Sequence, residues 1–337
     1  MHAKIAAIEY HLPSNRLTNE DLSAIYGAWS PEKIESKTGI VERRISDADE
    51  CSSDLAEIAC RKLFSSGACK PEDIDFLLLC TQSPDFFLPT TACILQNRLG
   101  LPLTAGALDF NLGCSGFVYG LGLAKGLIET GQAKRVLLVT AETYSKFIHP
   151  GDRSVRSIFG DGAAATLVVA GDGSEPSIGP FIYGTDGSGA RNLIVPVGGM
   201  RKKKVTGDTR TVDEFGNERT AENLYMNGAE VFTFTLRAVP EAVRQLLDRS
   251  RKTLDEFDLV VFHQANHYML EHLRKRLEIP TERFYVALRK YGNTVSATIP
   301  IALKDAMDHG VLTSGMTVML VGFGVGYSWA ATVVNWA

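Results

Sequence analysis

Residues 109–120, Asp-Phe-Asn-Leu-Gly-Cys-Ser-Gly-Phe-Val-Tyr-Gly, decide the architecture predicted for this chain. Cys114 lies where an apolar strand at 105–110 ends and a long apolar helix at 117–128 begins. The flanking glycines let the backbone turn tightly and let a substrate come close. The first N–H groups of a helix are unpaired and form the positive end of its dipole, which favours a thiolate. Cys114 is therefore either a nucleophile or a small core residue at a strand–helix junction.

The composition is that of an ordinary globular protein. Of the 337 residues, 45% are hydrophobic and 22% are charged, and the net charge is −4. This charge predicts no general affinity for nucleic acid or for an anionic membrane. No apolar run reaches the roughly 18–20 residues of a membrane span, and the N-terminus resembles a first strand, so we expect a cytoplasmic protein. The six cysteines form no Cys-x-x-Cys pair, which predicts free thiols and no metal site.

Apolar periodicity predicts alternating strands and helices in the first part of the chain. We expect strands at 4–10, 76–80, 105–110 and 135–141, and another after a glycine turn within 158–170. We expect helices at 19–28, 31–37, 53–66, 90–99 and 117–128. Glycine and charge then rise over 172–223, where we expect a linker and an insertion over the active-site face. Helical spacing returns at 229–249.

A second half of the chain repeats the first. Residues 70–80 match 253–263, because each segment has an acidic turn ending in Asp and then a buried apolar strand, at an offset of 183 positions (258 − 75 = 183). Strands that are apolar on both faces must be covered by helices on both sides. We therefore predict an α/β fold with a layered αβαβα architecture, built from two pseudo-symmetric halves, residues 1–171 and 172–337.

Three side chains lie at corresponding ends of these predicted elements. His263 ends a buried strand, where a side chain is structural or projects into a cleft. Asn293 stands in a Gly-Asn turn before a helix at 298–308, in the place that Cys114 takes in the first half, and is either a helix N-cap or a donor to a substrate. A pseudo-twofold axis would bring these ends together, so we expect Cys114, His263 and Asn293 to share one site.

These residue types suit one chemistry. A thiolate at Cys114 attacks an acyl thioester and holds the acyl group covalently. The backbone N–H of Cys114 and one from the turn at Gly324 and Val325 would stabilise the tetrahedral oxyanion. Loss of CO2 from a malonyl thioester then supplies a carbon nucleophile, if the neutral donors His263 Nε2 and Asn293 Nδ2 stabilise the enolate oxygen.

Four ordered motifs carry a resemblance to a known family. They are Asn111-Leu-Gly-Cys-Ser-Gly-Phe117, His263-Gln-Ala-Asn266, Gly292-Asn-Thr294 and Gly322-Phe-Gly-Val-Gly-Tyr-Ser-Trp329. Over essentially the whole chain, the sequence resembles the ketoacyl-(acyl carrier protein) synthase III family of thiolase-like condensing enzymes. The resemblance implies a thiolase fold, a homodimer and a catalytic triad of Cys114, His263 and Asn293. It also implies that an acyl-CoA or acyl carrier protein thioester condenses with malonyl-(acyl carrier protein), with no cofactor beyond these substrates. The implied products are a 3-oxoacyl-(acyl carrier protein), CO2 and a free thiol carrier.

The resemblance also places residues at the substrate entrance. Lys37, Arg153 and Asn266 match positions that contact CoA or phosphopantetheine. Lys33 stands where the family often has a Trp that stacks on the CoA adenine. Tyr268 stands where an Arg that helps dock the carrier protein is common. These departures leave open whether CoA or an acyl carrier protein brings the acyl group.

Two further sets of residues follow from the same resemblance. Leu88 stands where a Phe from the partner subunit often closes the acyl pocket, which would permit a longer or branched acyl group. We expect the acyl pocket and the dimer interface to include Leu88, Phe87 and Phe323. The candidate docking patch for an acidic carrier protein is Arg274, Lys275 and Arg276.

Three alternatives remain at this point. Hydroxymethylglutaryl-CoA synthases also use Cys, His and Asn, but they carry a Glu acid–base where this chain has Gln82. An acyltransferase that passes the acyl group from Cys114 to an alcohol or amine would use His263 as a base and need no decarboxylation, whereas Asn293 favours carbon–carbon bond formation. A non-catalytic partner subunit of a condensing enzyme would have lost the cysteine, which this chain retains.

Overall fold

Two sheets carry the fold, one from each half of the chain. The computed structural model describes residues 1–27, 29–171, 173 and 176–336. The first sheet has the order β1 (His2–His11), β7 (Gly162–Gly171), β6 (Arg135–Glu142), β4 (Phe76–Cys80) and β5 (Gly106–Phe110). The second has the order β13 (Leu259–Phe262), β14 (Thr317–Gly324), β15 (Ser328–Asn335) and β8 (Ile178–Thr185). Residue 172, where the predicted second half begins, and residue 28, where a helix is predicted to end, lie outside the described residues.

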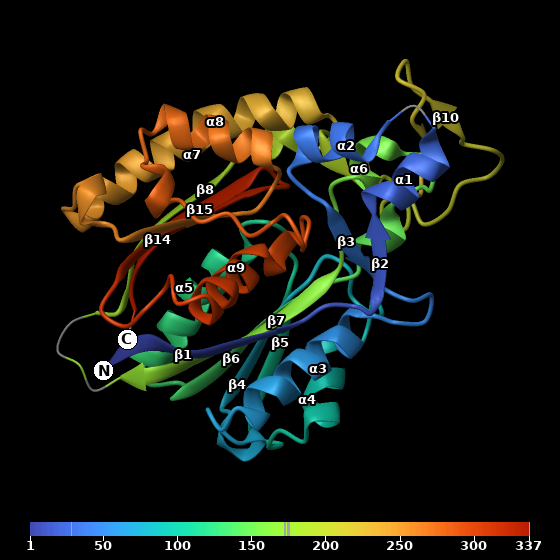
Figure 1. The fold of residues 1–337 in the computed structure, drawn as a ribbon. Helices are drawn as coiled ribbons and strands as arrows, with labels where there is room; N and C mark the ends of the chain where they lie inside the picture. The colour runs from blue at the N-terminus through green and yellow to red at the C-terminus, as the bar shows by residue number, and fades with distance from the viewer. Residues whose placement is uncertain (28, 172, 174–175, 337) are drawn as a thin grey trace.

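Six helices cover these sheets in three layers (Figure 1). The outer face of the first sheet carries α3 (Ser52–Ser65) and α4 (Thr91–Leu99). The outer face of the second sheet carries α7 (Gly228–Ser250) and α8 (His267–Arg276). Between the sheets lie α5 (Gly116–Glu129) and α9 (Thr298–Asp308). This confirms the predicted αβαβα layering.

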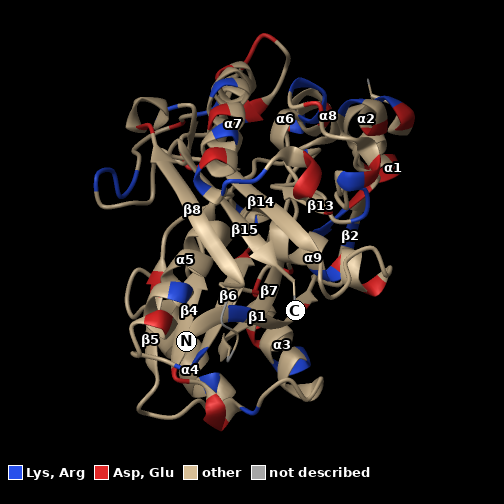
Figure 2. Ribbon diagram, turned by 90° about the vertical axis from the view of Figure 1, so that its left-hand side faces the viewer, with Lys and Arg blue, Asp and Glu red and all other residues tan. Residues whose placement is uncertain are grey.

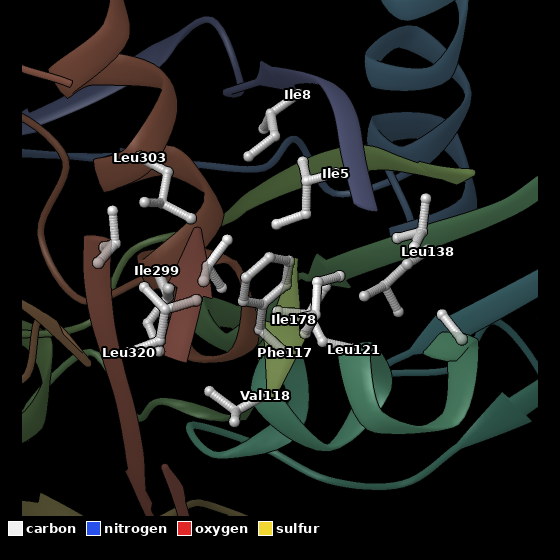
Figure 3. Close-up of a cluster of buried hydrophobic side chains, with 14 of the residues drawn as sticks. Ile5, Ile8, Phe117, Val118, Leu121, Leu138, Ile178, Ile299, Leu303 and Leu320 are labelled. Carbon is white, nitrogen blue, oxygen red and sulfur yellow. The ribbon is translucent and has the colours of Figure 1, made fainter. Parts of the chain in front are cut away.

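The two central helices are apolar because a sheet lies on each side of them. Phe117 and Leu121 of α5 and Ile299 of α9 pack in one cluster with Leu138 of β6 and Leu320 of β14, and all five are fully buried (Figure 3). Burying one such side chain contributes roughly 1.5–3 kcal/mol. The cluster therefore fixes the two helix N-termini, which lie beside the strand ends, relative to both sheets.

The second sheet repeats the first without its fifth strand. In the first sheet β4 pairs in parallel with both β5 and β6, and in the second β13 pairs in parallel with β14. A single parallel bridge between Val260 and Phe284 takes the place of the β4–β5 pairing. The edge strand β5 therefore has no equivalent of the same length in the second half of the described chain.

Residues 172–223 do not form only a linker and an insertion. They contain β8, which pairs antiparallel with β15 and belongs to the core of the second sheet. The linker interpretation is therefore wrong for 178–185, where Gly and Pro interrupted the strand pattern. The remainder forms short strand pairs, β9 (Leu193–Ile194) with β12 (Tyr225–Met226) and β10 (Thr211–Val212) with β11 (Glu218–Arg219).

A smaller N-terminal unit lies beside the hairpin of β10 and β11 (Figure 1). It consists of β2 (Asn15–Thr18), α1 (Asn19–Tyr26), α2 (Pro31–Thr38) and β3 (Glu42–Ile45), with α6 (Arg153–Arg156) close by. Lys or Arg occur in β2, α2, β3 and α6, and the charged residues of α1 are Glu and Asp, whereas β8, β14 and β15 contain no Lys, Arg, Asp or Glu (Figure 2). Among the residues that the structure describes, no helix has both the length and the apolarity to cross a membrane.

Candidate active site

One cavity of about 170 Å3 opens where the strand ends of the two halves meet. Cys114, His263 and Asn293 all line it, together with Phe323 and Gly324. Cys114 comes from the turn before α5, His263 follows β13, and Asn293 comes from the turn before α9. The structure thus brings together three side chains that are up to 179 positions apart in sequence (293 − 114 = 179).

Cys114 lies against the end of β14. A Cβ at Gly324 would stand 2.8 Å from both Cβ and Sγ of Cys114, so this close approach requires glycine. The backbone N–H groups of Val325 and of Cys114 itself face the thiol and favour its charged form. An oxyanion hole needs two such N–H groups aimed at one point.

Burial reverses the protonation state expected for Cys114. Desolvation, and then the nearby Glu142 carboxylate, raise the pKa of the thiol to about 12, against the smaller opposite effect of the two N–H groups. Burial thus outweighs the tendency of a helix N-terminus to favour the thiolate. A nucleophilic role for Cys114 would require a base that takes its proton.

His263 is a buried, neutral imidazole. Its side chain is 2% exposed, and burial lowers its pKa to about 3. Nδ1 lies 2.7 Å from Thr298 Oγ1, and the ring stands edge-on to Phe323 with centroids 5.6 Å apart. These contacts hold the ring with Nε2 toward Asn293, so His263 can accept a proton at Nε2 or, in its other tautomer, donate one.

Asn293 is held in one orientation by its own turn. Its Oδ1 accepts a hydrogen bond of 2.9 Å from Val295 N–H, so its Nδ2 is free to donate and lies 3.5 Å from His263 Nε2. Val295 has φ of 55°, which is rare for a β-branched residue and marks a strained backbone. The N-cap alternative for Asn293 is wrong, because a 3-10 helix at Val295–Ala297 intervenes and Ala297 precedes α9.

A buried carboxylate that the sequence analysis missed connects the two halves beneath Cys114. Glu142, at the end of β6, accepts hydrogen bonds from Gln82 N–H at 3.1 Å, Ser83 Oγ at 3.1 Å and Ser296 Oγ at 2.7 Å. Burial is the largest cause that raises its pKa, to about 8. The available signal was a single acid at the end of an otherwise apolar strand.

Trp29 is a second residue that the sequence did not single out, and it lies among three cations. The Arg153 guanidinium and the Lys37 ammonium each lie 5.1 Å from the centre of its indole ring, and the Lys33 ammonium lies 6.0 Å away. Trp29 directly precedes Ser30, the N-cap of α2, whereas Lys33 is in the first turn. The family often has a Trp at the position of Lys33; here Trp29, four residues earlier, places an indole among these cations instead.

Of the other predicted site residues, some line the cavity and others do not. Asn266 lines the cavity, but its Oδ1 caps α8 by accepting from Met269 N–H at 2.9 Å. Phe323 also lines it, whereas Phe87 and Leu88 are 77% and 83% exposed and do not line it within this chain.

The predicted docking patch on α8 is partly neutralised. Arg274 and Lys275 pair with Glu271 at 2.7 and 3.3 Å. Arg276 is exposed on the same helix. The free positive charge of this patch is therefore smaller than the sequence suggests.

Comparisons with known proteins point to one family. The family model of 3-oxoacyl-(acyl-carrier-protein) synthase III matches residues 108–187, and the model of its C-terminal part matches 247–336. A beta-ketoacyl-(acyl-carrier-protein) synthase III of Caldanaerobacter subterraneus subsp. tengcongensis is 39% identical over 97% of this chain and 96% of its own length.

Solved structures extend the likeness to the whole fold. A crystal structure of a 3-oxoacyl-(acyl-carrier-protein) synthase III is 54% identical, with a TM-score of 0.98 over all of both chains. A 3-oxoacyl-(acyl-carrier protein) synthase from Burkholderia xenovorans LB400 is 38% identical, with a TM-score of 0.92 over 100% of this chain and 95% of its own.

Proposed function

The chain belongs to the 3-oxoacyl-(acyl-carrier-protein) synthase III family of thiolase-like condensing enzymes, and from that premise we propose roles for its residues. It is an acyltransferase that carries out the condensation that initiates fatty-acid synthesis. One observation carries our assignment of roles: Cys114, His263 and Asn293 line one small cavity. Cys114 is the nucleophile, and the other two residues act on it and on the malonyl thioester.

Acylation comes first. His263 Nε2 takes the Cys114 proton as the sulfur attacks the acyl thioester, because the buried thiol does not ionise by itself. The N–H groups of Cys114 and Val325 stabilise the oxyanion. The departing thiolate then recovers the proton from His263, which leaves an acyl-Cys114 and a free thiol carrier.

Decarboxylation and condensation follow. Asn293 Nδ2 and His263 Nε2 donate to the thioester oxygen of malonyl-(acyl carrier protein) as CO2 leaves and negative charge moves onto that oxygen. The enolate carbon attacks the acyl carbon, and the C–S bond to Cys114 breaks with its electron pair on sulfur. A 3-oxoacyl-(acyl carrier protein) is released, and the Cys114 thiolate takes up a proton from solvent to restore the thiol. A buried cation here would hold the departing carboxylate, so two neutral donors favour its loss.

Intact-protein mass spectrometry tests this sequence of steps. The enzyme is mixed with a panel of acyl-CoAs and acyl carrier proteins, with Cys114→Ala as control. We expect one added acyl mass that is absent in the control and is cleared as a 3-oxoacyl product by malonyl-(acyl carrier protein). Clearance by an alcohol or amine alone would favour the acyltransferase alternative, and no adduct from any donor would contradict the assignment of Cys114.

The acyl donor is CoA in this proposal. Trp29 offers an aromatic face for an adenine, and Arg153, Lys37 and Lys33 around it offer cations for phosphates. Trp29→Ala should raise KM for acyl-CoA roughly tenfold, with kcat unchanged, because one stacking contact contributes about 1–3 kcal/mol. The matched control is acyl-pantetheine, which lacks the nucleotide and should be used equally by both proteins; equal KM values for acyl-CoA would exclude this role.

The enzyme acts as a homodimer in this proposal, with Phe87 and Leu88 at the interface. Phe86, Phe87 and Leu88 are 60%, 77% and 83% exposed in succession, and contiguous apolar surface of this kind marks an interface. A cavity of about 270 Å3 next to the site, lined in part by Tyr144 and Val325, would hold the far end of a longer acyl group once the partner covers it. Leu88→Glu should give monomers in light scattering, whereas Leu103→Glu, at 98% exposure, should not.

The carrier protein docks on the exposed cations of α8 in this proposal. Lys275 and Arg276 point to solvent, and an acidic partner would compete with Glu271 for Lys275. Arg276→Glu should raise KM for malonyl-(acyl carrier protein) severalfold and leave acylation by acyl-CoA unchanged. An equal KM in the variant would move the docking surface elsewhere.

A further inference from the structure

Thr298 connects the catalytic histidine to the turn that carries the catalytic asparagine. It is the first residue of α9 and is 3% exposed. Its Oγ1 lies 2.7 Å from His263 Nδ1 and 3.1 Å from the carbonyl oxygen of Val295. The same residue, Val295, holds the Asn293 amide through its N–H. Thr298 is therefore in a position to influence His263 without touching the substrate.

The positions of the protons follow from counting donors. A hydroxyl has one proton, and a neutral imidazole has one N–H. If Thr298 donates to the Val295 carbonyl, its oxygen must accept from His263 Nδ1–H, which leaves a lone pair on Nε2. Asn293 Nδ2 is a donor, because Oδ1 is occupied, and it lies 3.5 Å from Nε2. A lone pair on Nε2 fits this neighbour, whereas an N–H would face another N–H.

We propose that Thr298 is a positioning residue that sets the tautomer of His263, with the proton on Nδ1 in the resting enzyme, and that its hydroxyl allows the opposite tautomer in the second half-reaction. The proposal rests on the roles proposed above for Cys114 and His263. The resting tautomer has the lone pair on Nε2 that acylation needs, because Nε2 must take the Cys114 proton as the S–C bond forms.

The second half-reaction needs an N–H on Nε2. The Thr298 hydroxyl can rotate away from the Val295 carbonyl and donate to Nδ1. A hydroxyl can therefore either accept from Nδ1–H or donate to Nδ1, whereas a backbone N–H could only donate and a carboxylate could only accept. One proton then passes from Nδ1 to water and one passes from water to Nε2, so the charge on the ring is unchanged. His263 Nε2 can then donate to the enolate oxygen.

Nitrogen NMR of 15N-histidine protein tests the resting tautomer directly, because protonated and unprotonated ring nitrogens of a neutral imidazole differ in chemical shift. The chain has seven histidines, and the His263 signals are those missing from His263→Gln. We expect a protonated Nδ1 and an unprotonated Nε2 at neutral pH. A protonated Nε2 in the resting wild-type enzyme would overturn the proposal, whether or not any Thr298 variant folds.

Variants test the effect on rate. Thr298→Val keeps the shape and removes the hydroxyl, so the single-turnover acylation rate should fall roughly tenfold to hundredfold while KM for the acyl donor stays the same. Thr298→Ser should restore the rate and the wild-type NMR signals. The matched control is Thr294→Val, since Thr294 is fully buried in the same turn and its Oγ1 has no hydrogen-bond partner among the described residues.

Three rate results would contradict the proposal: an unchanged rate in Thr298→Val, no rescue by Ser, or an equal loss in Thr294→Val, which would indicate packing alone. Failure of the proposed function looks different. If the proposed role of Cys114 is wrong, Cys114→Ala will still acquire the acyl mass, and this result is independent of the His263 tautomer that NMR reports.

Discussion

The turn before α5 and the turn before α9 occupy equivalent places in the two halves but carry different chemistry. The helices begin 182 positions apart (298 − 116 = 182), so Cys114 corresponds to Ser296 and Asn111 to Asn293. The expectation that Asn293 takes the place of Cys114 is thus wrong by three residues. Ser296 donates to Glu142, whereas Cys114 faces the cavity.

The strand ends show the same divergence. Glu142 ends β6 where Gly324 ends β14, again 182 positions later (324 − 142 = 182). The carboxylate in the first half accepts from Gln82 N–H, after β4, and from Ser296, in the turn before α9. The glycine in the second half lets Cys114 approach the backbone N–H of Val325. One backbone plan therefore places Cys114 from one half in the same cavity as His263 and Asn293 from the other.

The largest expected effect is on acylation, and it comes from replacing Cys114 compared with its equivalent, Ser296. Cys114→Ala should abolish acylation, because no other group in the cavity is a comparable nucleophile, whereas Ser296→Ala should still form the acyl adduct. Intact-protein mass spectrometry measures both. An adduct in Cys114→Ala, or none in Ser296→Ala, would mean that the two turns do not differ as described.

The next effect compares the two asparagines. Asn293→Ala should leave acylation largely intact and lower malonyl decarboxylation roughly 10²–10³-fold, because one of the two donors to the enolate is lost. Asn111→Ala should change decarboxylation little, since Asn111 is exposed and accepts from Gln82 at 3.2 Å. Release of labelled CO2 measures the step, and equal acylation defects in both variants would contradict the assigned roles.

A smaller effect concerns the pH dependence of stability. The folded state raises the pKa of Glu142 from 4.5 to about 8, so it holds this proton more tightly than the unfolded chain does. Stability should therefore fall as pH rises from about 4.5 to about 8, by an amount on the order of a few kcal/mol, and stay low above that. Glu142→Gln should flatten this decline in thermal unfolding; parallel curves for both proteins would show that Glu142 does not titrate there.

The smallest effect concerns Gly324, the glycine that occupies the position equivalent to Glu142 in the second half. Gly324→Ala should destabilise the fold by about 1–3 kcal/mol and slow acylation, because the new methyl group overlaps Cys114 Sγ. Gly126→Ala, in α5 with open space around the added Cβ, should be neutral or stabilising. Urea unfolding of the two variants measures the difference, and equal stability would mean that the strand end can move away from Cys114.

The sequence by itself determined the layered fold, the repeat and the three residues that line the central cavity. Apolar periodicity and turn residues act locally, so strands such as β4 and β14 and helices such as α5 could be placed without coordinates. Cys114, His263 and Asn293 were recognised from their places at a strand–helix junction, a strand end and a Gly-Asn turn, and from the family motifs that contain them. The strand β8 was missed because Gly179 and Pro180 break its pattern, and pairing with β15 forms it.

Only the tertiary structure decided the electrostatics and the contacts between the halves. The protonation of Cys114 depends on burial, which outweighs the local helix terminus. The bonds of Glu142 to Ser296 and of Thr298 to His263 join residues 154 and 35 positions apart, and no local pattern specifies such pairs. Trp29 likewise lies beside Arg153, 124 positions away in the chain (153 − 29 = 124), because side-chain proximity follows from how elements pack and not from where their residues stand in the chain.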